Sequence, residues 1–386
     1  MLVKLKDICT IKSSKRIFEK EYVESGIPFI RGKEITDKSI SNPDNKFECY
    51  ISKERFLELK ESFGVPQVGD ILMTAVGTVG NTYYINKQID FYYKDGNVIQ
   101  FTNFSKKINS EYLYFFFNSS LFNFILNNIL IGAVQKALTM DMLKEIEIEL
   151  PSLEIQNKIV NILSNIDNQI ERNNAMTKRL QDMILTRYSI MFQDKTNKNG
   201  LLKDICLLPS GHNFKPEIYN NYGEYKLITI KNVCDTFVDD INTDKISEVP
   251  NIKDYCYLNI GDILLSLTGN VGRISIVHSK NNLLNQRVSL LQVKENYKIY
   301  SYCLLKSQEY QFIMTNIARG TSQKNLSPID VENLQIYMPT FEEIKAFNEN
   351  TENYFNEMLI IKQSTESLIK LKNTLLPLLI NGQLSV

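Results

Sequence analysis

The feature that most constrains the fold of this chain is a repeat that covers most of its length. The segment Leu-Lys-Asp-Ile-Cys begins at Leu5 and again at Leu202. Gly-Asp-Ile-Leu begins at Gly69 and again at Gly261, and a Gly-x-Val-Gly turn follows it both times. Self-similarity over so long a period indicates two copies of one structural unit. We therefore expect two domains of the same fold, at 1–150 and 202–338.

Each copy is followed by a segment with helical periodicity. Over about 152–192 and 341–376, apolar residues recur every three or four positions, which is the pattern of paired helices. A helix of about 40 residues is about 60 Å long, and neither helix can bury its apolar stripe alone. The residues expected to form the contact are Ile155, Ile159, Ile162, Ile166, Ile170, Leu180, Ile184, Ile344, Phe347, Tyr354, Met358, Ile361, Leu368 and Leu375.

These patterns predict an α+β protein: two pseudo-repeated α/β domains joined by two long antiparallel coiled-coil helices. The helices should occupy 151–193 and 339–386, the second with the C-terminal tail, and a linker should occupy 194–201. Short strands are expected near 29–31, 70–74 and 98–101.

The amino-acid composition excludes fewer classes of protein than the repeat does. The 44 basic and 44 acidic residues cancel, so any positive surface must be local. The six cysteines form no C-x-x-C pair and there are two histidines, which argues against a metal site. Scattered cysteines and the lack of a signal-peptide pattern favour the cytoplasm.

An uncharged stretch, 112–135, could be mistaken for a membrane span. It aligns without a gap with a segment of the second copy that carries Lys306, Glu309 and Arg319. A charged helix of that kind is costly in lipid. We expect both segments to be helices packed inside soluble domains, and we expect no membrane partner.

Motifs for catalysis are missing from the sequence. It contains no G-x-x-x-x-G-K-[ST] phosphate loop and no Asn-Pro-Pro-aromatic or Asp-Pro-Pro-aromatic methyltransferase motif. Asn42-Pro43-Asp44 lacks the second proline and the aromatic residue. We therefore expect no catalytic residue and no bound cofactor in this chain.

The first copy closes with Gly132-Ala-Val-Gln135-Lys-Ala-Leu138-Thr, then Ile146-x-Ile148-x-Leu150-Pro151, and the second closes with the stretch from Gly320 to Pro339. The C-terminus contains Leu-Leu-Pro-Leu-Leu-Ile-Asn-Gly. Through these segments and the Gly-Asp-Ile-Leu strand with its glycine turn, the chain resembles the specificity (S) subunits of type I restriction–modification systems over nearly its full length. The chain departs from the family where an Arg often follows that strand, since Ala75 and Leu267 stand there.

The resemblance implies that each copy is a target recognition domain for one part of a bipartite double-stranded DNA target. It implies that the helices set the spacing between the two half-sites of the target. It also implies that the helices dock two methyltransferase (modification) subunits, which use S-adenosylmethionine. Restriction subunits with motor and nuclease activity would use ATP and Mg²⁺. The alternatives are the recognition subunit of a type II system, a standalone enzyme, and a structural adaptor that binds no DNA.

Polar and basic residues that could contact DNA lie at matching places in the two copies. Bases are read by hydrogen bonds to their edges, and phosphates by Lys, Arg, small hydroxyls and backbone amides. In the first copy the predicted contacts are Lys12, Ser13, Lys15, Arg16, Arg31, Lys33, Thr74, Thr78, Asn81, Tyr93, Lys94, Asn97, Gln135 and Lys136. In the second copy they are His212, Asn213, Lys215, Lys231, Asn232, Ser266, Thr268, Asn270, Arg273, Asn285, Gln286, Arg287, Gln323 and Lys324.

A structural interpretation stays open for each group of these residues. The same patterns suit a solvated loop, an ordinary exit from a strand, a tight turn between strands or a helix end. Because the two sets differ at nearly every loop, DNA contact by both predicts an asymmetric target.

Overall fold

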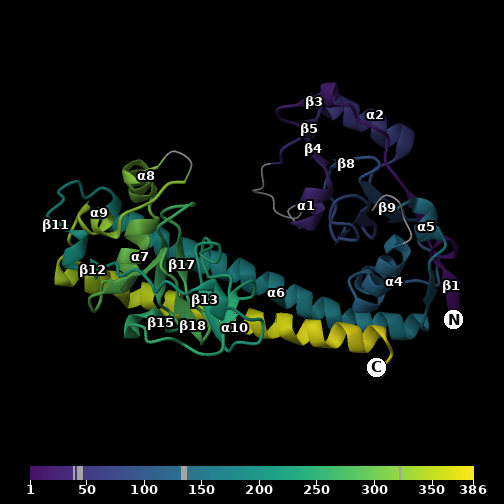
Figure 1. The fold of residues 1–386 in the computed structure, drawn as a ribbon. Coiled ribbons are helices and arrows are strands. Elements are labelled where there is room, and N and C mark those ends of the chain that lie inside the picture. The colour runs from purple at the N-terminus through teal and green to yellow at the C-terminus, as the bar shows by residue number, and fades with distance from the viewer. Residues whose placement is uncertain (38–39, 41–46, 132–136, 321–322) are drawn as a thin grey trace. The chain divides into compact units, whose positions relative to one another are not determined.

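The structure is a computed structural model, and it describes residues 1–37, 40, 47–131, 137–320 and 323–386. The chain divides into two units (Figure 1). Unit 1 holds Met1–Asn168 and Ile369–Val386, and unit 2 holds Gln169–Leu368. Among the predicted DNA contacts, Gln135 and Lys136 lie outside the described residues.

Unit 1 contains an antiparallel sheet with the strand order β2-β9-β6-β7 and a mixed sheet with the order β3-β5-β4-β8, in which β4 and β8 are parallel. Its strands are β1 (Leu2–Lys4), β2 (Thr10–Lys12), β3 (Tyr22–Val23), β4 (Ile27–Ile30), β5 (Tyr50–Ile51), β6 (Ile71–Thr74), β7 (Thr82–Tyr84), β8 (Tyr92–Tyr93), β9 (Val98–Thr102) and β10 (Glu147–Glu149). Its helices are α1 (Gly32–Thr36), α2 (Lys53–Phe63), α3 (Ser110–Phe117), α4 (Ser120–Ile131) and α5 (Met140–Lys144), followed by the start of α6 (Leu153–Tyr188). β6 and β9 pair antiparallel and are buried at every position, so they form the centre of the unit.

Unit 2 repeats this plan with the strand orders β17-β16-β19 and β14-β13-β18-β15. Its strands are β11 (Gly200–Leu201), β12 (Cys206–Leu207), β13 (Tyr225–Ile228), β14 (Asp244–Ile246), β15 (Tyr257–Leu258), β16 (Ile263–Ser266), β17 (Ile274–Ile276), β18 (Asn282–Leu284), β19 (Val288–Leu290), β20 (Gln292–Val293) and β21 (Gln335–Ile336). Its helices are α7 (Lys298–Lys306), α8 (Gln308–Ile317) and α9 (Pro328–Glu332), followed by the start of α10 (Phe341–Ile380). β16 takes the central place that β6 takes in unit 1.

The uncharged stretch of the first copy forms α3 and α4 of unit 1. Asn109 begins α3, since its side-chain oxygen accepts a hydrogen bond from the amide of Glu111 at 2.9 Å. The ring of Phe117 packs against that of Phe101 in β9, with centroids 4.8 Å apart. The apolar character of this stretch therefore serves the core of the unit. Among the described residues, no helix is both long enough and apolar enough to cross a membrane.

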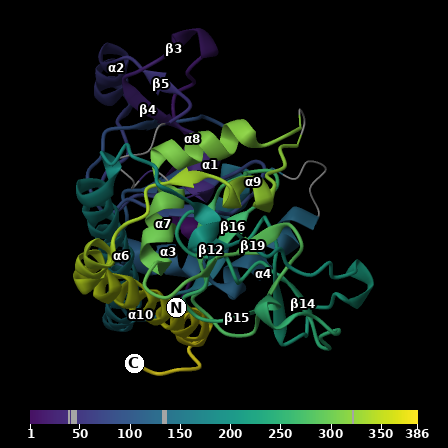
Figure 2. The ribbon, with the colours of Figure 1, turned by 90° about the vertical axis from the view of Figure 1, so that its left-hand side faces the viewer.

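The two long helices pack together, and their contacts show an antiparallel pair (Figures 1 and 2). In unit 1, Lys372 near the end of α10 forms an ion pair of 2.6 Å with Asp167 in α6. In unit 2, the ring of Tyr188 at the end of α6 lies 6.5 Å from that of Phe347 near the start of α10. In each unit, the C-terminal part of one long helix thus lies beside the N-terminal part of the other long helix.

The helices also belong to the cores of their units, which the sequence pattern did not predict. Ile159 and Leu163 share a core with the aromatic residues of α3 in unit 1, and Ile184 and Phe347 share one with Tyr300 of α7 in unit 2. Ile155, one of the predicted contact residues, is 38% exposed. It lines a surface cavity of unit 1 with Leu379 and the C-terminal tail.

Candidate nucleic-acid interface

A tight loop follows the central strand of unit 1 and is held by one buried hydroxyl. Thr74, at the end of β6, donates a hydrogen bond to the carbonyl of Thr78 and accepts one of 3.0 Å from the amide of Asn81. Gly77 and Gly80 have φ values of 80° and 92°, a region that glycine enters without strain. The loop is therefore a fixed part of the fold.

Unit 2 builds the same loop from different residues. Ser266, at the end of β16, donates to the carbonyl of Asn270 at 2.5 Å and accepts from the amide of Arg273 at 3.0 Å. Gly269 and Gly272 take φ values of 74° and 82°. The backbone of the loop is thus shared by the two units, while its exposed side chains differ.

Backbone hydrogen bonds bring the other predicted loops of unit 1 to this strand end. The amide of Ala75 donates to the carbonyl of Asn97 at 2.8 Å, and the amide of Lys94 donates to Ile30 at 2.8 Å. The hydroxyl of Ser14 donates to the carbonyl of Tyr93 at 2.6 Å. The loops 12–16, 31–36, 74–81 and 93–97 therefore form one continuous surface, here called face 1.

The corresponding bonds assemble face 2 in unit 2. The amide of Leu267 donates to the carbonyl of Arg287 at 3.0 Å, and the amide of Asn285 donates to Ile228 at 3.2 Å. The amide of His212 donates to Leu284 at 2.9 Å, and the amide of Gly269 donates to Lys324 at 3.1 Å. Face 2 thus consists of the loops 210–215, 229–232, 266–273, 285–287 and 323–326.

Some of the residues predicted to contact DNA are buried, so their side chains are not part of the exposed surface of either face. Their side chains hold the loops from inside: Tyr93 donates to Gln100 at 2.9 Å, Asn232 donates to the carbonyl of Asp239 at 3.0 Å, and Thr268 donates to Asn325 at 2.8 Å. Burial also raises the pKa of Tyr93, which keeps its hydroxyl protonated. The buried predicted residues are Thr74, Tyr93, Asn232, Ser266, Thr268 and Asn285.

Half of the basic residues of face 1 are paired with carboxylates. Glu48 accepts from Arg31 at 2.7 Å and from Lys33 at 2.5 Å, and these two contacts lower its pKa to about 2. Arg16 pairs with Asp95 at 2.8 Å. Within the described chain, Lys12, Lys15 and Lys94 make no ion pair, and Lys15 lies over the ring of Phe63.

Face 2 leaves more of its positive charge unpaired. Lys231 pairs with Asp244 at 3.0 Å, and Lys324 donates to the carbonyl of Thr315 at 3.1 Å. In the part of the chain that the structure describes, Lys215, Arg273 and Arg287 are exposed and make no ion pair. Exposed amide side chains lie among these cations, at Asn213, Gln286 and Gln323.

The remaining predicted residues of face 1 form short polar links. Asn81 donates to the hydroxyl of Thr36 at 3.0 Å, and Thr36 lies 3.3 Å from the hydroxyl of Thr78. Ser13 accepts from the amide of Gly96 at 3.2 Å. The sequence reasoning missed Thr36 and Glu48. Thr36 follows Arg31-Gly32-Lys33 within one turn of a short helix, which was the available signal, but nothing local pointed to Glu48.

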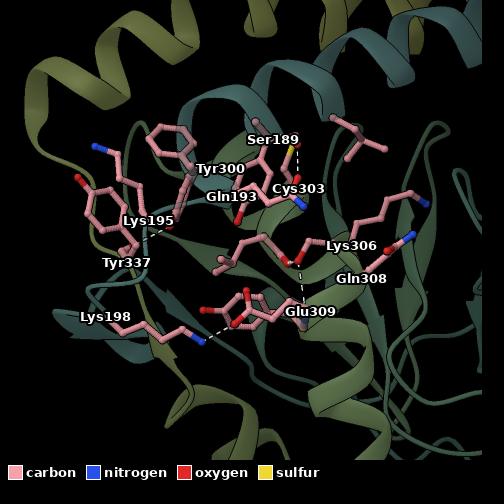
Figure 3. Close-up of a pocket in the computed structure, with 16 residues that line it drawn as sticks. Ser189, Gln193, Lys195, Lys198, Tyr300, Cys303, Lys306, Gln308, Glu309 and Tyr337 are labelled. Atoms are coloured by element: carbon pink, nitrogen blue, oxygen red, sulfur yellow. Dashed lines mark hydrogen bonds and ion pairs between the residues drawn. The ribbon is translucent and has the colours of Figure 1, made fainter.

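Unit 2 also holds a pocket of about 340 Å³ that shares no residue with face 2 (Figure 3). It lies at the end of α6, and its rim carries Lys195 and Lys198, the latter paired with Glu309 at 2.5 Å. Cys303 lines it, but complete burial raises the pKa of the thiol well above its usual value. A protonated thiol is a poor nucleophile, so this pocket offers no activated cysteine.

Comparison with known proteins places this duplicated fold in a family. The model of the type I restriction modification DNA specificity domain matches twice, over residues 1–181 and 195–370. The chain therefore belongs to the type I restriction–modification specificity subunits, the non-catalytic subunits that determine DNA target recognition within their complexes.

Individual relatives agree with this assignment. The MjaIX specificity subunit of a type I restriction enzyme from Methanocaldococcus jannaschii is 26% identical over 99% of this chain and 93% of that protein. A putative specificity subunit from Haemophilus influenzae is 30% identical, over 43% of this chain and 40% of that protein. The crystal structure of a type I S subunit from M. genitalium matches the fold with a TM-score of 0.60 at 15% identity, covering 98% of this chain and 95% of that one.

Proposed function

We propose that face 1 and face 2 each read one half-site of a bipartite, asymmetric double-stranded DNA target. The observation that carries this proposal is the repeated strand-end loop with its repeated backbone hydrogen bonds and its unlike exposed side chains. A shared backbone would present both faces to a duplex in the same way. Unlike side chains would give the two half-sites different sequences.

The long helices supply the second part of the proposal. We propose that α6 and α10 set the length of the unread spacer between the half-sites and dock two methyltransferase subunits. Restriction subunits would join the same complex. S-adenosylmethionine, ATP and Mg²⁺ would bind to these partner subunits, which would carry out the catalytic reactions. The complex would act in the cytoplasm, where the six cysteines of this chain would stay unpaired, as they are in the structure.

An exchange of recognition regions tests the assignment of the faces. Residues 202–338 are replaced by the same region of another specificity subunit with a known, different target. Sequencing of methylated genomic DNA should then show one half-site changed and the other retained, because face 1 is untouched. The reciprocal exchange of residues 1–150 is the matched control and should change the other half-site. Retention of both original half-sites after either exchange would refute the proposal.

A further inference from the structure

Two residues flank the end of the central strand in each unit. In unit 2, the amides of Ser266 and Leu267 donate 3.0 Å hydrogen bonds to the carbonyls of Arg273 and Arg287. In unit 1, Thr74 and Ala75 make the same bonds, of 2.9 and 2.8 Å, to Asn81 and Asn97. The shared pattern of bonds makes Arg273 equivalent to Asn81, and Arg287 equivalent to Asn97.

The equivalent residues differ in chemistry in both cases. Arg273 and Arg287 are exposed, and within the described residues neither guanidinium has an ion-pair partner. Asn81 and Asn97 are half-buried, and Asn81 uses one amide hydrogen on Thr36. Unit 2 therefore presents two guanidinium groups at the place where unit 1 presents two carboxamides.

From this contrast we infer that Arg273 and Arg287 read guanine in the half-site of face 2. The inference rests on the proposed function. A guanidinium donates two parallel hydrogen bonds to O6 and N7 of guanine in the major groove, whereas a carboxamide pairs with N6 and N7 of adenine. The half-site of face 1 then has no guanine specified by this pair of positions.

The alternation between Arg and Asn favours base contacts over phosphate contacts. A phosphate contact gains most of its strength from positive charge, which asparagine lacks. Arginine and asparagine side chains both form hydrogen bonds with base edges, arginine preferring guanine and asparagine preferring adenine. The carbonyls that anchor these residues are bonded to the central strand, and the buried hydroxyl of Ser266 holds the amide of Arg273. Such fixed backbone suits readout at a defined distance from a base.

Reciprocal substitutions at one equivalent pair test the inference. The full-length variants Arg287→Asn and Asn97→Arg are purified in the complex that each forms in its host, and each complex selects its target from a random duplex library. Arg287→Asn should reduce the guanine preference of one half-site about 10- to 100-fold. Asn97→Arg should add a guanine preference to the other half-site, and Arg273→Asn should act on the same half-site as Arg287→Asn.

Lys280→Asn is the matched control, because Lys280 is exposed in unit 2 but lies outside face 2 and outside the two long helices. It should leave the selected motif unchanged, and circular dichroism should show equal folding of all variants. An unchanged motif in Arg287→Asn and Arg273→Asn would overturn the inference. So would a uniform loss of affinity for all sequences with a smaller salt dependence, which marks a phosphate contact. If the unmodified complex selects no bipartite motif, the proposed function itself fails.

Discussion

At the scale of single residues, buried charge fixes part of unit 2 against α10. Asp240 is 7% exposed and accepts hydrogen bonds of 2.5 Å from both Lys226 and Ser279. The Nε2 atom of His278 lies 3.4 Å from the same carboxylate and 3.9 Å from Glu366 of α10. Burial by itself would raise the pKa of Asp240, but the contacts with His278, Lys226 and Ser279 outweigh burial and lower it. The native fold therefore favours the ionised carboxylate.

Replacement of this carboxylate should destabilise unit 2 in a pH-dependent way. Asp240→Asn should lower the free energy of unfolding at pH 7 by about 1.5–3 kcal/mol, the usual range for lost hydrogen bonds to a charged group. Because the folded pKa of Asp240 is lowered, its contribution is complete above the usual aspartate pKa of 3.8 and is lost as the pH falls below that value. Urea unfolding at pH 7 and at pH 3 should show a large difference between variant and parent at pH 7 and a smaller one at pH 3.

Asp235→Asn is the control for this comparison. Asp235 pairs with Lys306, but its side chain is 91% exposed. An exposed ion pair contributes about 0–1 kcal/mol. Equal effects of the two substitutions at pH 7 would show that the buried carboxylate has no special role.

At the scale of elements, each long helix is both a partner of the other helix and a wall of a unit. Ile184 of α6 and Phe347 of α10 are fully buried, and they share one core with the strands and helices of unit 2. The rings of Phe192 and Phe347 lie 5.4 Å apart in an edge-to-face contact. Unit 2 should therefore not fold stably without both helix segments.

Truncation of a helix residue tests this dependence. Phe347→Ala should lower the free energy of unfolding of the full chain by about 3–5 kcal/mol, because it removes a buried ring and leaves a cavity. Ile360→Ala on the same helix is the control, since Ile360 is 66% exposed and should change stability by about 0.5 kcal/mol or less. Urea unfolding followed by tyrosine fluorescence measures both. If Phe347→Ala were as mild as its control, the helix would not belong to the core of unit 2.

At the scale of the whole molecule, the proposed function requires the helices to determine the spacer in the DNA target. Asp167 of α6 and Lys372 of α10 form an ion pair within unit 1, which shows that the two helices lie side by side at these residues. Both helices can therefore be lengthened by the same amount at this level. Seven residues correspond to nearly two helical turns, so an insertion of this length in both helices preserves the contacting stripe.

Insertion of one heptad after residue 168 and one before residue 369 should lengthen the unread spacer. The added rise is about 10 Å, which equals about 3 base pairs of B-form DNA at about 3.4 Å each. Sequencing of methylated DNA should show both half-sites unchanged and further apart. A control insertion in one helix alone should abolish methylation, because it shifts one stripe against the other. An unchanged spacer in the double insertion would rule out the helices as its determinant.

The large features of this fold could be predicted from the sequence because they depend on local periodicity. A stripe of apolar residues at helical spacing must be buried wherever the helix lies, so Leu180, Ile184 and Phe347 could be identified without a structure. The second unit could be predicted from the repeat, because segments of similar sequence adopt similar backbone conformations. The strand-end glycines also follow from sequence, because the turn needs their positive φ.

Only the tertiary structure decided which polar residues are exposed and which charges are free. Thr74 and Thr78 stand in one loop, yet Thr74 is buried under it and Thr78 is exposed. Arg31 is paired with Glu48 across a gap of 17 residues, whereas Arg287 has no ion-pair partner in the described chain. Composition and spacing cannot distinguish these cases, because burial and ion pairing depend on distances between segments that are remote in sequence and are fixed only when the sheets close.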